Sequence, residues 1–341
     1  MLLIDASNIG GGGTVLLQYL AERLRQRSLK HFILVSPRVD VSLSEHQVIA
    51  GATPISRRRR VALANLVHDL RPQKILCFGN VPPPFHIPKV KVFTYFHNAL
   101  LIPGLVPARF DLRNQVGFKL LRFCIKRFGA HTAEWVFQTQ YVCEMFASSL
   151  ASKGFKGVVF PFYPPFQTAQ QGMSDIASDF IFVSNYSLHK NHANLLRAVI
   201  ECARRDVFPT LVLTINENCS PQIHDLSRQC EAVGARVIFA GSVSHEKSLE
   251  LTRSSRFAIF PSLIETLGLG ALEAIANGKD LLISDRPWVD AVCNSSLRFD
   301  PASPTSIADA MQTALRAQTL TPSVIKVNDR IDELIDHMYH V

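Results

Sequence analysis

Short apolar runs alternate along the chain with longer stretches in which apolar residues recur at helical spacing. In the first half this pattern predicts strands over 2–5, 32–36, 74–78, 90–96 and 135–138, and helices over 14–27 and 61–70. In the second half it predicts strands over 180–184, 210–214, 237–240, 257–260 and 280–284, and helices over 191–204, 223–232, 245–254 and 269–276. Such alternation is typical of parallel sheets with helices on both faces.

The length of the chain favours two domains, because 341 residues are more than one ordinary core holds. A segment rich in Pro and Gln, 160–172, separates the two halves. We therefore predict a first domain over 1–165, a second over 166–322 and a terminal segment over 323–341. Apolar residues at positions 331, 334, 335 and 338 predict a helix within that last segment.

Composition excludes several classes of protein. The seven cysteines form no C-x-x-C pair, which argues against a disulfide framework or a zinc site and favours a reducing cytoplasm. The first residues do not read as a secretory signal, and no apolar run approaches about 18 residues, the length that spans a membrane. We expect a cytoplasmic protein.

The net charge of +8 is unevenly distributed, since the first half is strongly basic and the second half is net acidic. Two stretches carry much of the positive charge: Arg57–Arg60, and the segment 109–128, in which Lys and Arg alternate with Phe and Leu. A basic, aromatic amphipathic helix is suited to the surface of an anionic membrane. A solvated face is the alternative. No nucleic-acid-binding motif accompanies these stretches, so we expect no nucleic acid partner.

The most informative stretch runs from Pro261 to Ala274. Glu265 and Glu273 lie eight positions apart, and a Gly-rich turn between them opens a predicted helix. The N-terminus of a helix offers backbone N–H groups to an anion. One carboxylate can therefore bind a sugar and the other a ribose, with a diphosphate between them.

This stretch, continued by Asn277-Gly278 and Ser284-Asp285, resembles the E-x7-E motif of retaining family 4 glycosyltransferases, the glycosyl transferases group 1. The resemblance implies the GT-B fold: two doubly wound, Rossmann-like parallel-sheet domains that face a cleft. It implies that the last helices pack back on the first domain. Glu265 would bind donor sugar hydroxyls as a catalytic residue, and Glu273 the ribose. The turn between them would line the donor site with Thr266, Leu267, Gly268 and Leu269.

The segment 182–191 resembles the donor-phosphate segment of the same family. Lys190 falls on the family lysine, which stabilises the charge that develops on the leaving diphosphate. Asn185 stands where the family usually has arginine, so one of two expected cations is missing at this donor-binding position. A solvated lysine at a helix start is the alternative for Lys190.

A second turn of the same half, Gly241-Ser242-Val243, follows a predicted strand and precedes a helix. The resemblance places these three residues beside the nucleotide base. An ordinary turn in which Ser244 caps the helix is the alternative.

The first half holds two further candidates. Four glycines follow the first strand, where they let backbone approach a phosphate or a sugar, and the resemblance makes them a loop of the donor and acceptor side: Gly10, Gly11, Gly12 and Gly13. A dinucleotide-binding loop is disfavoured, because its last glycine would fall at Val15. His97 lies at the carboxyl end of a strand and resembles the first-domain histidine near the donor sugar. A structural role is its alternative.

The resemblance thus implies a retaining glycosyltransferase. No D-x-D motif or metal-ligand spacing is present, so we expect a metal-independent enzyme without a cofactor, whose donor is a UDP-sugar or GDP-sugar. The acceptor would be a glycan or a polyprenyl-diphosphate-linked oligosaccharide of bacterial surface polysaccharide synthesis, on the inner face of the cytoplasmic membrane. A non-catalytic paralogue, favoured by Asn185, and a nucleotide-sugar epimerase are the alternatives.

Overall fold

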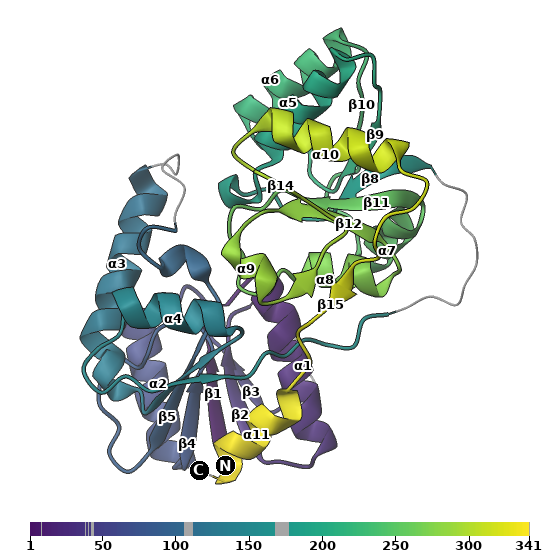
Figure 1. Cartoon of the computed structure of the whole chain (residues 1–341). Helices are drawn as coiled ribbons and strands as arrows, with labels where there is room; N and C mark the ends of the chain where they lie inside the picture. Colours follow the sequence, from purple (N-terminus) through teal and green to yellow (C-terminus); the bar gives the residue numbers. More distant parts are fainter. Residues whose placement is uncertain are drawn as a thin grey trace. The chain divides into compact units, whose positions relative to one another are not determined.

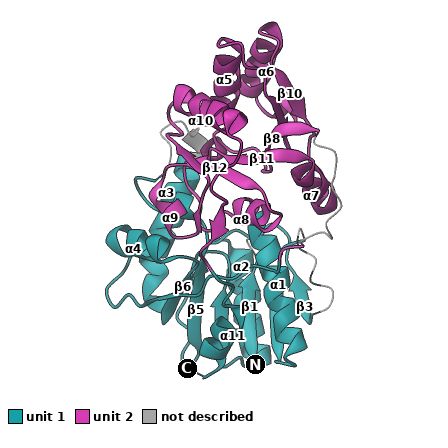
Figure 2. Cartoon of the chain, turned by 45° about the vertical axis from the view of Figure 1, so that its right-hand side comes forward, with its two compact units in different colours: residues 1–165, 328–341 teal, residues 166–327 magenta. Residues whose placement is uncertain are grey.

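The computed structural model describes residues 1–340 apart from 8, 38, 40, 42–43, 106–111 and 168–176, and it describes only the backbone of 112–114. The chain forms two compact units (Figure 2). Unit 1 comprises Met1–Pro165 and Asn328–Val341, and unit 2 comprises Phe166–Val327.

Unit 1 contains a seven-stranded parallel sheet in the order β3-β2-β1-β4-β5-β6-β7 (Figure 1). Its strands are β1 (Leu2–Ala6), β2 (His31–Val35), β3 (His46–Val48), β4 (Lys74–Cys77), β5 (Lys91–Phe96), β6 (Glu134–Phe137) and β7 (Gly157–Val159). Its helices are α1 (Gly12–Gln26), α2 (Arg57–Leu70), α3 (Leu112–Phe128), α4 (Gln140–Ser149) and α11 (Ile331–His340). The strand order reverses between β1 and β4, which defines the switch point where parallel sheets bind ligands.

Unit 2 contains a six-stranded parallel sheet in the order β10-β9-β8-β11-β12-β14. Its strands are β8 (Ser178–Phe182), β9 (Thr210–Leu213), β10 (Arg236–Phe239), β11 (Ser255–Phe260), β12 (Asp280–Ser284) and β14 (Leu297–Phe299). Two short strands, β13 (Cys293–Asn294) and β15 (Val324–Ile325), pair antiparallel. The helices are α5 (His192–Ala203), α6 (Pro221–Ala232), α7 (His245–Arg253), α8 (Leu269–Ala276), α9 (Pro287–Asp290) and α10 (Pro304–Arg316). The switch point here lies between β8 and β11.

Burial on both faces explains why these strands are continuous apolar runs. All five residues of β1 are buried, as are four of the five in β8 and in β12. Inner strands of parallel sheets are covered on both sides, so polar residues have no solvent-facing position. The predicted fold class, two α/β units with parallel sheets, is confirmed.

The last helix, α11, and Asp329 just before it make polar contacts with α1 within unit 1. Arg23 Nη2 lies 2.6 Å from Asp332 Oδ2, Tyr19 donates a hydrogen bond to Asp329, and Arg27 pairs with Asp336. These contacts tie the end of the chain to the helix that follows the Gly-rich loop.

Candidate functional site

Two loops meet at the switch point of unit 2. One follows β8 and ends in a 3-10 turn, Leu188–Lys190, and the other follows β11. Leu263 N donates to His189 O at 2.8 Å, and Asn191 Nδ2 donates to Pro261 O at 3.2 Å. These bonds fix the predicted phosphate segment against the predicted sugar-binding segment.

Lys190 and Glu265, which the sequence predicted separately, form an ion pair here. Lys190 Nζ lies 2.6 Å from Glu265 Oε1, and both side chains are largely buried. Burial alone would raise the pKa of Glu265, but the nearby Lys190 and His189 and hydrogen bonds to the carboxylate outweigh it and hold the pKa below its usual range. Glu265 is therefore ionised at neutral pH.

Helix α8 begins beside this pair, and two glycines let it do so. Gly268 precedes the helix with φ +70°, and a Cβ there would lie 3.0 Å from the Trp288 ring. A Cβ on Gly270 would lie 3.3 Å from the carbonyl oxygen of Val183, the residue directly after β8. The first turn of α8 carries no acidic residue, so its N–H groups and positive dipole end favour an anion. Leu267 is buried, so only its backbone can serve such a ligand.

Glu273 lies on α8, where its Oε1 is 2.6 Å from His245 Nε2 at the start of α7. The Glu273 side chain is 19% exposed. Ser244 caps α7 by accepting a hydrogen bond from Lys247 N at 3.2 Å. His245, which contacts Glu273, follows the turn Gly241–Val243 by two positions. The sequence did not single out His245 as a functional residue. Its position directly after the cap residue Ser244 was the feature that could have indicated it.

Two histidines flank Lys190 in sequence. His192 is 1% exposed and its Nε2 lies 3.0 Å from Ser184 Oγ. Burial lowers the pKa of His192 to about 3 and that of His189 to about 4, so both rings are neutral at pH 7. Asn185 is exposed, and within the described ranges no ion pair or hydrogen bond joins it to Lys190. Neither histidine was recognised from the sequence.

In unit 1, the Gly-rich loop and His97 lie together. A Cβ on Gly13 would lie 3.0 Å from His97 Nε2 and 2.9 Å from Ile9 Cγ1, so only glycine allows this approach. A Cβ on any of the other three glycines of the loop would have no neighbouring atom within 4 Å. Burial lowers the pKa of His97 to about 4, which keeps the imidazole neutral. The ring also stacks on Tyr95, with 5.3 Å between centroids.

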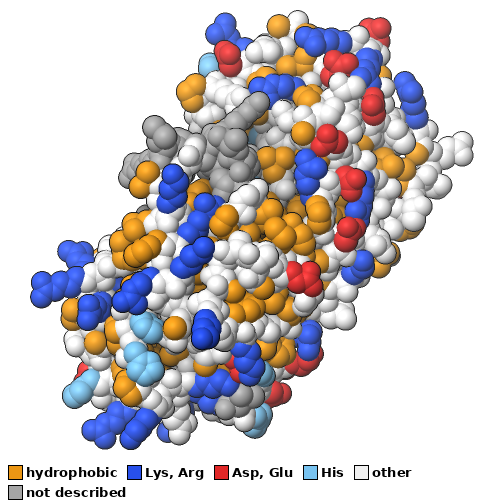
Figure 3. All heavy atoms as spheres, turned by 60° about the vertical axis from the view of Figure 1, so that its left-hand side comes forward, with side chains coloured by type: hydrophobic (Ala, Val, Ile, Leu, Met, Phe, Trp, Pro, Cys, Tyr) orange, Lys and Arg blue, Asp and Glu red, His pale blue; other side chains and the backbone are white. Residues whose placement is uncertain are grey.

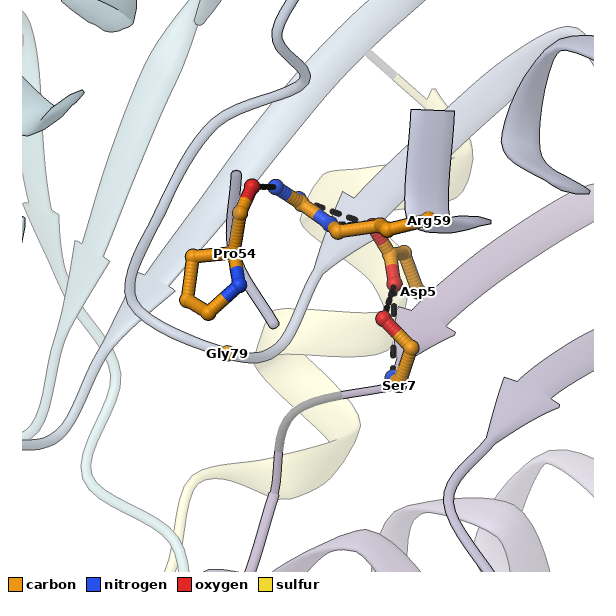
Figure 4. A pocket seen from close by; sticks show the side chains of 5 residues that line it. All are labelled: Asp5, Ser7, Pro54, Arg59 and Gly79. Atoms are coloured by element: carbon orange, nitrogen blue, oxygen red, sulfur yellow. Dashed lines mark hydrogen bonds and ion pairs between the residues drawn. The ribbon is translucent and has the colours of Figure 1, made fainter. Parts of the chain in front are cut away.

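The basic run Arg57–Arg60 is not uniformly exposed, which corrects the sequence interpretation. Arg59 is 3% exposed; its Nε lies 2.9 Å from Asp5 Oδ2, and its Nη1 donates to Pro54 O at 2.7 Å (Figure 4). Asp5 Oδ1 in turn accepts from Ser7 Oγ at 2.7 Å. Arg59 thus stabilises a small pocket at the switch point of unit 1, and only its three neighbours in the run lie on the surface.

The basic helix α3 also needs a correction. Arg122 turns inward, and its Nε donates to Leu101 O at 2.8 Å. The outward face instead shows an apolar stripe at helical spacing, Val116, Leu120 and Phe123, of which the first and last are each 63% exposed. Lys and Arg side chains surround hydrophobic ones over this side of unit 1 (Figure 3). The side chain of Arg113 lies outside the described residues, as do 109–111.

Two further findings concern the described part of the chain. None of its helices has the length and apolar content needed to cross a membrane. It also contains no group of three or more His, Cys, Asp or Glu side chains placed to hold a metal ion.

Comparison with known proteins identifies the fold. Residues 167–330 match the family glycosyl transferases group 1. The whole chain is similar to the structure of Anabaena Alr3699/HepE in complex with UDP and glucose, with TM-score 0.69, 15% identity and coverage of 99% of this chain and 94% of that one. A search of curated proteins found no match.

Two other structures give the same result. WaaG, a glycosyltransferase involved in lipopolysaccharide biosynthesis, aligns with TM-score 0.69 and 12% identity over 99% of both chains. Sucrose-phosphate synthase from Thermosynechococcus elongatus aligns with TM-score 0.67 and 14% identity over 92% of this chain and 89% of that one. The chain therefore has the GT-B fold, and residues 167–330, almost all of them in its second unit, match the glycosyl transferases group 1 family.

Proposed function

We propose that the protein transfers a sugar from a nucleoside diphosphate donor to an acceptor hydroxyl with retention of configuration. The observation that carries this proposal is the Lys190–Glu265 ion pair, 2.6 Å long, beside the N-terminus of α8. It combines a cation and free backbone N–H groups for a diphosphate with a carboxylate that accepts hydrogen bonds from sugar hydroxyls.

Each residue has a distinct part in this proposal. Lys190 and the first turn of α8 hold the diphosphate. Their electrostatic interactions with it become stronger as negative charge grows on the diphosphate during bond cleavage. Glu265 orients the sugar hydroxyls, and Glu273 binds the ribose. The turn Gly241–Val243 lies beside the base.

Retention requires no strong base in this mechanism. The leaving diphosphate accepts the proton of the acceptor hydroxyl on the face from which it departs, so the protein positions the reactants and stabilises charge. The chain's own groups suit that task, since Glu265 is held ionised and His97 is neutral at pH 7. We assign His97 to the donor sugar, in keeping with its contact with the Gly-rich loop.

The donor is proposed to be a UDP-sugar, with a GDP-sugar as the alternative. In support, the similar Alr3699/HepE structures contain UDP, UDP with glucose, or UDP-glucose. We further propose a role in bacterial surface polysaccharide synthesis, supported by the similarity to WaaG. The exposure of Asn185 supports one competing function, a paralogue that binds sugar nucleotide without turnover.

The acceptor is proposed to be a glycan carried on a polyprenyl diphosphate, reached from the inner face of the cytoplasmic membrane. The exposed face of α3 supports this, because Val116, Leu120 and Phe123 lie among Lys119, Lys126 and Arg127. Apolar side chains can enter the headgroup region while the cations contact anionic lipid.

A thermal-shift screen with UDP, GDP and their sugars tests the donor site first. A ligand that binds only the native state raises the midpoint of unfolding. We expect UDP or a UDP-sugar to raise the midpoint. A second assay, which measures turnover of that donor, distinguishes an enzyme from a paralogue that only binds the sugar nucleotide. A screen without any shift would contradict the proposal.

A further inference from the structure

The proposed diphosphate site has little net positive charge. Lys190 is paired with Glu265 at 2.6 Å, so the charge of one offsets that of the other. The end of α8 adds only a partial charge. A sugar-linked diphosphate is negative on both phosphates, and holding it calls for a further cation.

His189 is placed to supply that cation. It belongs to the same 3-10 turn as Lys190, and its Nδ1 lies 2.8 Å from Ser187 Oγ. Within the described part of the chain, no hydrogen-bond partner reaches its Nε2. The charged and titratable groups that face it are Lys190 and His192 from its own segment and Glu265 from the loop after β11.

We propose that His189 takes up a proton when a nucleoside diphosphate binds, so that its imidazolium and Lys190 hold the diphosphate together. This inference rests on the proposed function, because it concerns the donor site. The proton comes from solvent and returns to it when the ligand leaves.

The electrostatics of the ligand-free site agree with this exchange. Burial lowers the pKa of His189 to about 4, although Glu265 opposes the shift. An anion within contact distance raises the pKa of a histidine by roughly 1–3 units, and the upper end of that range brings the pKa of His189 to about 7. Between these two values, the ligand-bound protein holds one more proton than the free protein. Affinity for the diphosphate should therefore increase as the pH falls from about 7 toward about 5.

The test uses the methyl ester of UDP, with the methyl ester of GDP in parallel, because neither ester has a phosphate group that titrates in this range. Calorimetry in two buffers of different ionisation heat measures the protons taken up. We expect uptake close to one proton at about pH 5.5 and affinity roughly tenfold higher there than at about pH 7.5.

Three variants locate the proton. His189→Ala should lose both the uptake and the pH dependence. His189→Lys carries a permanent charge and should bind well at both pH values without uptake, which also shows that the site is intact. His224→Ala, an exposed histidine on α6 whose side chain is 49% exposed, should behave like the wild type.

The outcomes separate the two proposals. Failure of both esters to bind at any pH would contradict the proposed function itself. Binding without proton uptake would overturn only the role of His189. Proton uptake that persists in His189→Ala and disappears in His192→Asn would also overturn the role of His189, because it would assign the proton to the buried His192.

Discussion

Lys190 helps to keep Glu265 ionised in a largely buried position, and the two side chains form an ion pair. Removing one partner of such a pair leaves a buried charge without compensation, which is costly. The two residues are 75 positions apart in sequence, and only the meeting of the loops after β8 and β11 brings them together. Sequence analysis found both by motif but could not predict the pair.

Lys190→Ala should lower the rate of sugar transfer more than it lowers donor binding. The charge on the diphosphate grows as the glycosidic bond breaks, so Lys190 contributes most in the transition state. We expect kcat to fall on the order of 10²–10³-fold, by analogy with removal of one oxyanion donor. Steady-state kinetics measures this, with Lys247→Ala on the exposed side of α7 as control. An unchanged kcat with a raised KM would show that Lys190 only holds substrate.

Glu273→Ala should weaken binding of the donor. A hydrogen bond to a charged group is worth about 1.5–3 kcal/mol, or roughly 10–150-fold in affinity. Calorimetric titration with UDP measures the loss, and Glu246→Ala, an exposed acid on α7, is the control. Equal affinity in wild type and Glu273→Ala would remove Glu273 from the ribose site.

At the scale of elements, the sequence predicted best what is buried on both faces and worst what is exposed or short. The predicted strand 280–284 coincides with β12, whereas β3 was missed because all three of its residues are exposed and form no apolar run. Helix α10 was also missed, although Ser303 followed by Pro304 is a typical helix start. The inward turns of Arg59 and Arg122 depend on which side of a helix meets the sheet, which a basic run does not reveal.

The outward face of α3 should bind anionic membrane through its apolar stripe and its cations together. Each Lys or Arg near such a surface contributes about 1 kcal/mol, so neutralising Lys119, Lys126 and Arg127 together should weaken binding on the order of 10²-fold. Phe123→Ser should weaken it without changing the charge. Arg122 is excluded from this set because it bonds to the backbone of Leu101.

Co-sedimentation with vesicles of phosphatidylserine and phosphatidylcholine, compared with phosphatidylcholine alone, measures this binding. Glu144→Gln on the exposed side of α4 is a control for a surface change elsewhere in unit 1. Equal binding to both kinds of vesicle, or to neither, would show that the outward face of α3 is a solvated surface and not a membrane-binding one.

Helix α11 should depend on Glu134 of β6, which is 1% exposed and contacts Lys91, Lys156 and His337. Burial alone would raise the pKa of Glu134, but bonds to these three cationic or titratable groups lower it to about 2. A carboxyl whose pKa is lower in the folded state stabilises the fold above its unfolded pKa. That stability is lost as the pH falls from about 4.5 to about 2.

Glu134→Gln should therefore destabilise unit 1 by about 3–5 kcal/mol near pH 7, the usual cost of breaking a buried pair. Thermal unfolding measured at several pH values checks this, and the difference from wild type should shrink as the pH falls below about 4. A constant difference across that range would show that the charge of Glu134 is not what holds α11.

At the scale of the whole molecule, the alternation of strands and helices predicted two α/β units, and the motif in the second half predicted the group 1 family that residues 167–330 match. The first half carried less of this signal, because its Gly-rich loop and His97 are separated by more than 80 positions and meet only in the fold. The histidines around Lys190 were not predicted, since a histidine in a loop has no spacing that indicates a ligand.

The central claim is transfer of a sugar from a nucleoside diphosphate with retention. The most direct measurement is nuclear magnetic resonance of the product formed from a ¹³C-labelled α-linked UDP-sugar, with bacterial lipid-linked oligosaccharide as acceptor. We expect a new α-linked anomeric signal with wild-type protein, greatly reduced with Lys190→Ala. A β-linked product, or donor that binds without any transfer, would contradict the account.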